Sequence, residues 1–382
     1  MRTLVHIVRV LVGLLFIFSG LVKANDPLGL SYKMQEFFEV WGWHGWDNWT
    51  LSLSVLMNAF EIIAGTALIL GWRIRLFSWL LLLLIVFFTF LTGYTYFTGK
   101  PTNCGCFGDC LPISSKTSFL KDVALLVLIA FLCWKRNLIK PFLPAWLNIT
   151  KMVAVVIFAF GFQWYTLHFL PVVDCLPYKI HNNLAEKMKM PADAVPDSTV
   201  ITFVYDKKGQ TVEFTASQFP ADFNGTDYKL IKRYDKLIRK GKNNEPPIKG
   251  FNLSGPTDID STEFVLTQPY AILLFCENFS VPVSRWQADF EKIYAAAREK
   301  NIPCFMITAA PSAAPQAIRS TGFAGMQILK CDYKAIVSAA RTNPCIYLVQ
   351  KGTVVDKRSY HGMDKMLKQV QALPVQPVVN NP

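Results

Sequence analysis

Charged residues are scarce in this sequence of 382 residues: they make up 17%, whereas hydrophobic residues make up 52%. Acidic residues are the scarcer sign, with 27 Asp and Glu against 39 Lys and Arg, which leaves a formal net charge of +12. The apolar excess lies in the first half, which excludes an ordinary soluble composition there. Many basic residues flank apolar runs, which favours a role in membrane topology over nucleic-acid binding. We therefore expect a lipid bilayer, and no nucleic acid, as a partner.

A clear signal-peptide cleavage site is also lacking. No small-x-small pattern follows the first apolar run, residues 4–22, so we expect a retained helix. Four further runs cover about 51–71, 76–97, 119–134 and 152–170, each near the ~20 residues that cross a bilayer. The segment between the first two runs reads as a polar loop. Its tryptophans stand where interfacial aromatics lie, and they are Trp41, Trp43, Trp46 and Trp49.

Basic residues indicate the orientation of the five expected spans. They fall on alternate connections, which therefore face the cytoplasm. The residues concerned are Arg2, Arg9, Arg73, Arg75, Lys135, Arg136 and Lys140. For a bacterium this predicts a multi-pass protein of the cytoplasmic (inner) membrane whose C-terminal domain is periplasmic, where disulfides persist.

A cluster of thiols is the most distinctive feature of the first half. Cys104, Cys106 and Cys110 lie within seven residues of a glycine-containing loop, and Cys175 follows the fifth run on the same side. Four thiols allow three pairings, and they suit either an exchanging relay or two permanent clips. Metal binding ranks below both, because no histidine is close in sequence, although His44 could approach from the other outward loop. We therefore assign no metal ligands.

A carboxylate lies well inside the second apolar run. Glu61 is costly there unless it is paired, and Lys23 and Arg9 in the first run are the candidate partners. One interpretation is a proton-accepting or quinone-binding group near the thiols; the other is a buried polar pair that fixes helix packing, helped by Asn58. Gly65, Gly71 and the Gly13 and Gly20 pair are expected to allow close helix approach rather than to bind a ligand.

The second half has the composition of a charged globular domain. Residues 200–205 and 211–215 read as a β-hairpin, and residues 216–258 are polar and basic. Six basic residues there are spaced along a helix-like face that solvent would cover: Lys232, Arg233, Lys236, Arg239, Lys240 and Lys242.

From about residue 270 the pattern runs strand, helix, strand, helix, hairpin and closing helix, which predicts an α/β sandwich. Among the cysteines there, Cys276 is the candidate for a functional role, and the others read as buried apolar residues. The expected organisation is thus a transmembrane bundle over 1–175, a linker or insertion with the hairpin over 176–258, and an α/β domain over 259–375.

Three parts of the first half resemble the DoxX/MauE-like family of membrane proteins. They are Arg9 with the Ser19-Gly20-x-x-Lys23 helix end, Glu61-x-x-x-Gly65, and the Cys-Gly-Cys-Phe-Gly loop that begins at Cys104. MauE-type members are associated with disulfide formation in periplasmic partners and DoxX proteins with quinone-linked oxidation. The resemblance implies a periplasmic client protein and a quinone cofactor. It extends to Bacteroidetes proteins that join such a bundle to a thioredoxin-like domain.

The second half resembles a thioredoxin-like domain of the TlpA type. That family carries Trp-Cys-x-Pro-Cys after its first central strand, but here Phe279-Ser280-Val281-Pro282-Val283 stands in its place, without either thiol. Thr342-Asn343-Pro344 stands where the family has a cis-proline. Because exchange needs a thiolate, we expect this domain to bind or scaffold rather than catalyse.

Two hypotheses follow. In the first, the protein is a membrane thiol-disulfide oxidoreductase in which Cys104, Cys106, Cys110 and Cys175 carry the chemistry, Glu61 accepts a proton, and the thioredoxin-like domain presents the client. In the second, it is a non-catalytic envelope assembly or scaffold protein with structural disulfides and a protein-binding thioredoxin-like domain. The missing Cys-x-x-Cys favours the second hypothesis, and the dense outward thiols favour the first.

Overall fold

The structure is a computed structural model that describes residues 1–101, 105, 108, 110, 111, 113–142, 144–239, 241, 243–256 and 258–377. Five of its helices are long and apolar enough to cross a membrane. They are α1 (Arg2–Ala24), α3 (Asp47–Leu70), α4 (Ile74–Thr98), α5 (Ser115–Trp134) and α6 (Ala145–Phe169). The five expected apolar spans are therefore confirmed. A short 3-10 turn, η1 (Arg136–Leu138), follows α5.

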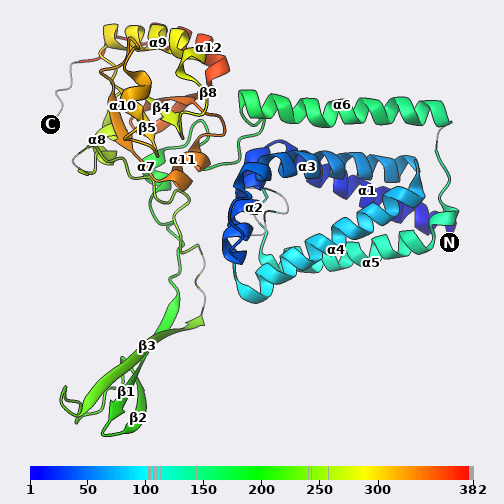
Figure 1. Cartoon of the computed structure of the whole chain (residues 1–382), viewed down its shortest axis with the longest axis horizontal. Coiled ribbons are helices and arrows are strands. Elements are labelled where there is room, and N and C mark those ends of the chain that lie inside the picture. Colours follow the sequence, from blue (N-terminus) through cyan, green and yellow to red (C-terminus); the bar gives the residue numbers. More distant parts are fainter. Residues whose placement is uncertain are drawn as a thin grey trace.

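Helices α1 and α3 pack at very short range through two glycines. A Cβ added to Gly13 would stand 2.8 Å from the carbonyl oxygen of Gly65, and one added to Gly65 would stand 2.7 Å from that of Gly13. A larger residue at either position would push the helices apart. The expected packing role of these glycines is confirmed. Helices α4 and α5 form a second pair, and α6 lies along α3 (Figure 1).

One expectation for the first half is wrong. Most of the segment between the first two spans is not a loop but the helix α2 (Pro27–Trp41), which lies across one end of the bundle (Figure 1). Asp26 caps it by accepting the Gly29 N–H at 3.0 Å, and Pro27 occupies the first turn. Both are ordinary helix-start signals. The other three tryptophans follow α2 or begin α3, and are more than half exposed: Trp43, Trp46 and Trp49.

The C-terminal domain is built on a five-stranded mixed sheet of order β6-β5-β4-β7-β8. Its strands are β4 (Ala271–Cys276), β5 (Cys304–Thr308), β6 (Gln327–Lys330), β7 (Cys345–Gln350) and β8 (Thr353–Ser359). Strands β4, β5 and β6 run parallel, and β7 and β8 run antiparallel to their neighbours. The predicted α/β domain is confirmed.

Helices cover both faces of this sheet. One face packs on α9 (Gln287–Glu299), α10 (Ala314–Ile318) and α12 (Met363–Ala372). The other packs on α7 (Leu184–Lys187), α8 (Thr262–Thr267) and α11 (Tyr333–Ala339). The 3-10 turns η2 (Val283–Arg285) and η3 (Tyr360–Gly362) lead into α9 and α12.

The segment between α6 and β4 packs partly on the α/β domain and partly projects from it. Its ends join the α/β domain, since Leu184 donates to Gly352 at 2.7 Å and Ser254 pairs with Lys330. Its middle projects as a three-stranded sheet of order β2-β1-β3 (Figure 1). The strands are β1 (Ser198–Lys207), β2 (Gln210–Thr215) and β3 (Tyr228–Arg239).

The expected β1–β2 hairpin is present, but the helix-like assignment of the basic segment is wrong. Residues 228–239 form β3, because their backbone groups pair antiparallel with almost the whole of β1. The spacing of the basic residues along this segment suits a helix as well as a strand, so it could not decide between them. Lys240 and Lys242 lie outside the described residues.

Candidate functional site

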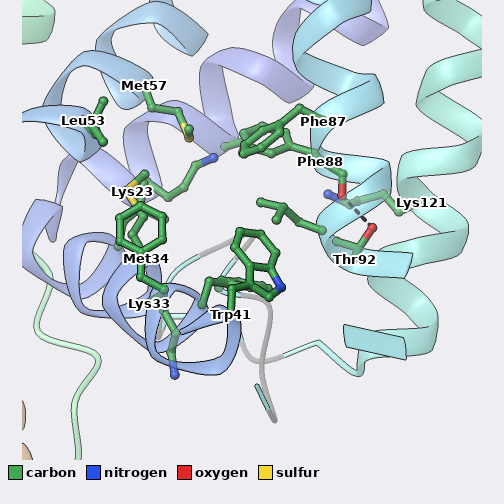
Figure 2. Close-up of a pocket in the computed structure, with 16 residues that line it drawn as sticks. Lys23, Lys33, Met34, Trp41, Leu53, Met57, Phe87, Phe88, Thr92 and Lys121 are labelled. Carbon is green, nitrogen blue, oxygen red and sulfur yellow. Dashed lines mark hydrogen bonds between the residues drawn. The ribbon is translucent and has the colours of Figure 1, made fainter. Parts of the chain in front are cut away.

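An apolar pocket of about 220 Å³ lies in the bundle near α2 (Figure 2). Helices α1 to α5 all contribute to its wall, together with Gly105 of the thiol loop. The lining is mostly aromatic and aliphatic, and its charged members are lysines. The lining residues are Ser19, Lys23, Leu30, Lys33, Met34, Phe37, Phe38, Trp41, Leu53, Met57, Phe87, Phe88, Leu91, Thr92, Gly105 and Lys121.

A buried ion pair stands beside this pocket. Lys23 Nζ donates to Glu61 Oε1, with the two side chains 3% and 0% exposed. Glu61 Oε2 has no hydrogen-bond partner among the residues that the structure describes. Lys23 itself reaches the pocket wall, where its Nζ lies 4.9 Å from the centroid of the Phe88 ring (Figure 2). The pair therefore puts a cationic hydrogen-bond donor at the edge of an apolar space.

Arg9, the other candidate partner of Glu61, lies at the opposite end of the bundle. Its guanidinium is 1% exposed, donates to the Lys140 carbonyl at 3.2 Å and stands over the Phe142 ring. The structure thus pairs Glu61 with Lys23 and leaves Arg9 to bind the segment after α5. A cofactor-binding role for these three residues stays a prediction.

A second polar group on the pocket wall was missed by sequence reasoning. Thr92 of α4 donates to Asp122 Oδ2 of α5 at 3.0 Å, and Lys121 pairs with Asp122 Oδ1 at 2.8 Å. Asp122 is 1% exposed. The available signal was a carboxylate inside the apolar run 119–134, the same signal that singled out Glu61.

The thiol loop contacts the pocket through its glycine. Gly105 lines the pocket, and a Cβ added there would stand 3.0 Å from Cγ of Lys33 on α2. Gly108 donates to the Gly105 carbonyl at 3.0 Å, and both glycines have positive φ. Cys104 and Cys106, the predicted catalytic thiols on either side of Gly105, lie outside the described residues.

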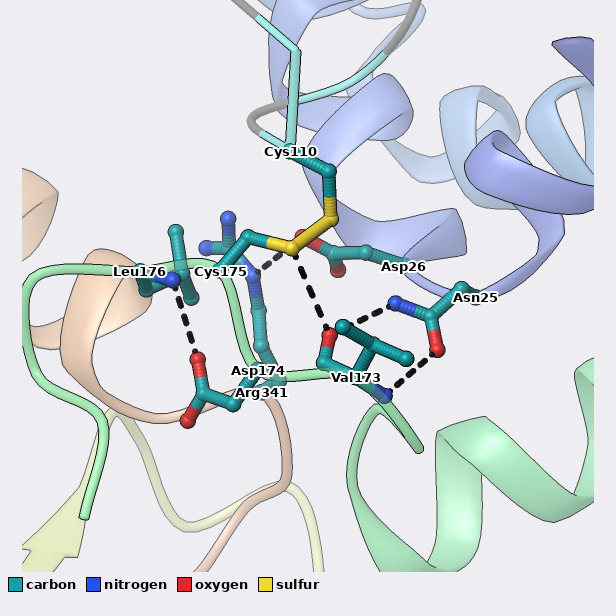
Figure 3. Close-up of a disulfide and its surroundings, with 8 residues drawn as sticks. All are labelled: Asn25, Asp26, Cys110, Val173, Asp174, Cys175, Leu176 and Arg341. Carbon is teal, nitrogen blue, oxygen red and sulfur yellow. Dashed lines mark hydrogen bonds and ion pairs between the residues drawn. A yellow bond between two sulfur atoms is a disulfide. The ribbon is translucent and has the colours of Figure 1, made fainter.

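The other two predicted thiols are joined. Cys110 and Cys175 form a disulfide with their Cα atoms 4.9 Å apart (Figure 3). The bond ties the thiol loop to the segment that leaves α6. Asn25 holds that segment from the other side, since it exchanges hydrogen bonds with the backbone of Val173 at 2.8 and 3.0 Å.

No cysteine stands at residues 279–283 of the α/β domain, which follow β4. β4 ends at Cys276, and Asn343 accepts the N–H of the next residue, Glu277, at 3.1 Å. The predicted cis-proline is confirmed at Asn343–Pro344. Cys276 and Cys345 are buried, and burial raises the pKa of Cys276 well above its usual range and that of Cys345 to about 12. A thiol protonated at neutral pH is a poor nucleophile.

The segment that leads into the cis-proline, and contains Arg341, contacts the bundle. Arg341 Nε donates to Asp26 Oδ2 at 2.9 Å, with the side chains 4% and 14% exposed (Figure 3). Lys357 of β8 donates to Asp174 at 2.8 Å, next to the disulfide. The thiol loop, α2 and the α/β domain therefore meet at one end of the bundle.

No metal cluster accompanies these groups. The described part of the chain holds no group of three or more His, Cys, Asp or Glu that could bind a metal ion.

These features define a multi-pass membrane protein that carries a thiol loop beside an apolar pocket and a fused α/β domain. Residues 1–135 match the family of the methylamine utilisation protein MauE, which confirms the expected MauE-like bundle. Residues 192–240 match a domain of unknown function. Two crystal structures of yeast Sco1, one of them with copper bound, match at 16% identity and a TM-score of 0.25, over 32% of this chain and 91% and 93% of the Sco1 chains. No curated protein matches the chain.

Proposed function

We propose that this protein is a membrane-bound thiol-disulfide oxidoreductase in which Cys104 and Cys106 exchange with client proteins and pass electrons to a quinone. One observation carries the proposal: Gly105, the residue between these two thiols, lines the apolar pocket of the bundle. Gly105 is bonded to both of these residues in the chain, and the pocket that it lines suits the ring of a lipid-soluble electron acceptor. The MauE-like sequence of the bundle supports the same redox class.

The proposed cycle balances in two steps. A client dithiol attacks the Cys104–Cys106 disulfide, so that the client leaves with a disulfide and the loop becomes a dithiol. The loop dithiol then gives two electrons and two protons to a quinone, which leaves as quinol while the Cys104–Cys106 bond re-forms. In this cycle the disulfide Cys110–Cys175 stays oxidised and ties the loop to the segment that leaves α6.

The pocket suits a quinone head group in shape and polarity. Its volume of about 220 Å³ is below the roughly 300–1,000 Å³ of sites that enclose a whole drug-sized ligand, so it would take the ring and leave an isoprenoid tail among the helices. Lys23 would donate a hydrogen bond to a quinone oxygen, where charge develops on reduction. Glu61 holds Lys23 in place and would accept a proton at Oε2, which has no partner within the described part of the chain.

Membrane orientation supports a periplasmic client. Basic residues concentrate at the end of the bundle opposite the soluble domain, in the connections that follow α3 and α5. The side with these residues faces the cytoplasm in bacterial inner membranes. The thiol loop and the α/β domain would then face the periplasm.

Quinone-dependent oxidation of a dithiol tests the proposal. Purified protein in lipid vesicles with a soluble benzoquinone is expected to oxidise a dithiol client and to reduce the quinone in equal amounts. Cys104→Ser and Cys106→Ser should each abolish turnover, whereas Cys133→Ser, at the far end of α5, should leave it unchanged. Equal rates for all three variants would refute the proposal.

A non-catalytic assembly role is the second candidate. It is favoured by the docking of the cis-proline side onto the bundle through Arg341 and Asp26, which suits a fixed scaffold. In that role the client would form a stoichiometric complex that resists reductant, without mixed disulfides through Cys104 or Cys106.

A further inference from the structure

A polar cleft of about 570 Å³ lies between α2 of the bundle and α11 of the α/β domain. It is distinct from the apolar pocket, but Lys33 lines both, with Gly105 packed on its side chain. A group bound in the cleft would therefore lie one side chain away from the loop that holds the two proposed thiols.

The lining of the cleft mixes both signs of charge with aromatic rings. Lys33 and Glu36 come from α2, where they pair at 2.9 Å, and Tyr333 and Lys334 come from α11. Arg341 also lines the cleft, but its Nε is engaged by Asp26. No single sign dominates this wall, so it does not suit a phosphate or another compact anion. A wall that holds both donors and acceptors suits the backbone of a polypeptide, and the aromatic rings can contact its side chains.

The dimensions of the cleft suit a short extended segment. Helix α11 has 7 residues, which at ~1.5 Å each gives a wall about 10 Å long. An extended chain advances about 3.3 Å per residue, so about three residues lie along this wall.

We propose that this interdomain cleft binds an extended, cysteine-bearing segment of the client polypeptide and presents its thiol to the loop next to Lys33. The inference rests on the proposed redox function and specifies its substrate class. It also gives the thioredoxin-like domain a role that does not use its own cysteines. Helix α11 forms one wall of the cleft, and the Arg341–Asp26 pair fixes that wall to the bundle.

The test compares a short synthetic peptide that carries two cysteines with dithiothreitol, a small dithiol that needs no cleft. Two variants place a bulky ring in the cleft from opposite walls: Ser338→Trp on α11 and Glu36→Trp on α2. Lys292→Trp, exposed on α9 on the other face of the sheet, is the matched control. Full-length protein in lipid vesicles is used throughout, and binding is measured separately with the same peptide in which serine replaces cysteine.

We expect both cleft variants to bind the serine peptide about tenfold more weakly and to oxidise the cysteine peptide correspondingly more slowly. The reason is that the introduced ring occupies the cleft and removes the contacts of the peptide with its walls. Dithiothreitol oxidation should not change, and the control should match the wild type in every assay. Unchanged peptide binding in both variants would overturn the cleft assignment and leave the redox function standing. Absence of dithiol oxidation in the wild type would overturn the redox function, and the substrate role of the cleft with it, even if the serine peptide still bound.

Discussion

Arg341 and Asp26 are 315 positions apart in the chain, yet the guanidinium of one donates to the carboxylate of the other at 2.9 Å. Asp26 caps α2 at the end of the bundle. Arg341 lies two residues before Asn343, whose peptide bond to Pro344 is cis. The pair therefore joins the α/β domain to the membrane bundle.

Removing one member of this pair should loosen the two halves. Asp26→Asn leaves the Arg341 guanidinium buried without its carboxylate, which costs about 3 kcal/mol for a buried pair. We expect a lower Tm and faster proteolysis of the segment between α6 and the sheet. Lys334→Ala is the control, because its partner Glu39 is 3.8 Å away and both are more than 70% exposed, so the loss should stay below about 1 kcal/mol. Equal effects of the two substitutions would contradict this role.

The Lys23–Glu61 pair should behave as a unit. Lys23→Met alone leaves a carboxylate buried in the bundle without its cation and should destabilise the protein by about 3–5 kcal/mol. Adding Glu61→Gln removes the uncompensated charge, so the double variant should recover much of the Tm in detergent. Quinone reduction should stay low in the double variant. Recovery of both stability and quinone reduction would mean that the pair serves helix packing alone.

Filling the apolar pocket should separate the two half-reactions. Met57→Trp places a ring in the pocket from α3, while Leu56→Trp, at an exposed position on the same helix that does not line the pocket, is the control. We expect Met57→Trp to slow quinone reduction about tenfold or more and to leave single-turnover exchange with a client dithiol unchanged. A Met57→Trp enzyme with normal quinone reduction would place the acceptor elsewhere.

The buried cysteines of the α/β domain should be chemically silent while it is folded. Burial raises the pKa of Cys331 and of Cys345 to about 12, and raises that of Cys276 as well. At pH 8 these thiols stay protonated, so iodoacetamide should label them only after denaturation. Because the unfolded thiols ionise near pH 8.5–9 and the folded ones do not, their contribution to stability is complete below that pH and falls as the pH rises towards 12. Rapid labelling of Cys276 in folded protein would reopen a redox role for this domain.

The elements carried by local patterns were predictable from the sequence. The five apolar runs predicted the spans. The apolar run at residues 271–276 predicted the central strand β4, and the turn at Lys351-Gly352 predicted the hairpin of β7 and β8. The misses have two causes. Helix α2 had its signals in Asp26 and Pro27, but the tryptophans around its end favoured a loop. Strand β3 depends on pairing with β1, which no local pattern of basic residues reveals.

The site was predictable only where one residue was anomalous on its own. Glu61, a carboxylate in an apolar run, pointed to the Lys23 pair, and Asp122 could have done so for Thr92. The disulfide partner of Cys110 was one of three possibilities until the fold brought Cys175 to it. The contact of Arg341 with Asp26 had no sequence signal, because it depends on how two separate domains dock.

The central claim is tested most directly by titrating Cys104, Cys106, Cys110 and Cys175 in intact membranes. Samples equilibrated in graded redox buffers are acid-quenched and alkylated with a mass tag, and each cysteine is then quantified separately. The proposed function predicts that Cys104 and Cys106 titrate together in the range of catalytic dithiols, roughly −270 to −120 mV, while Cys110–Cys175 stays oxidised to below about −300 mV. If Cys110 and Cys175 titrate with them, the disulfide belongs to the relay. If all four thiols stay locked until strong reduction, the exchange mechanism is contradicted and the protein is an assembly factor.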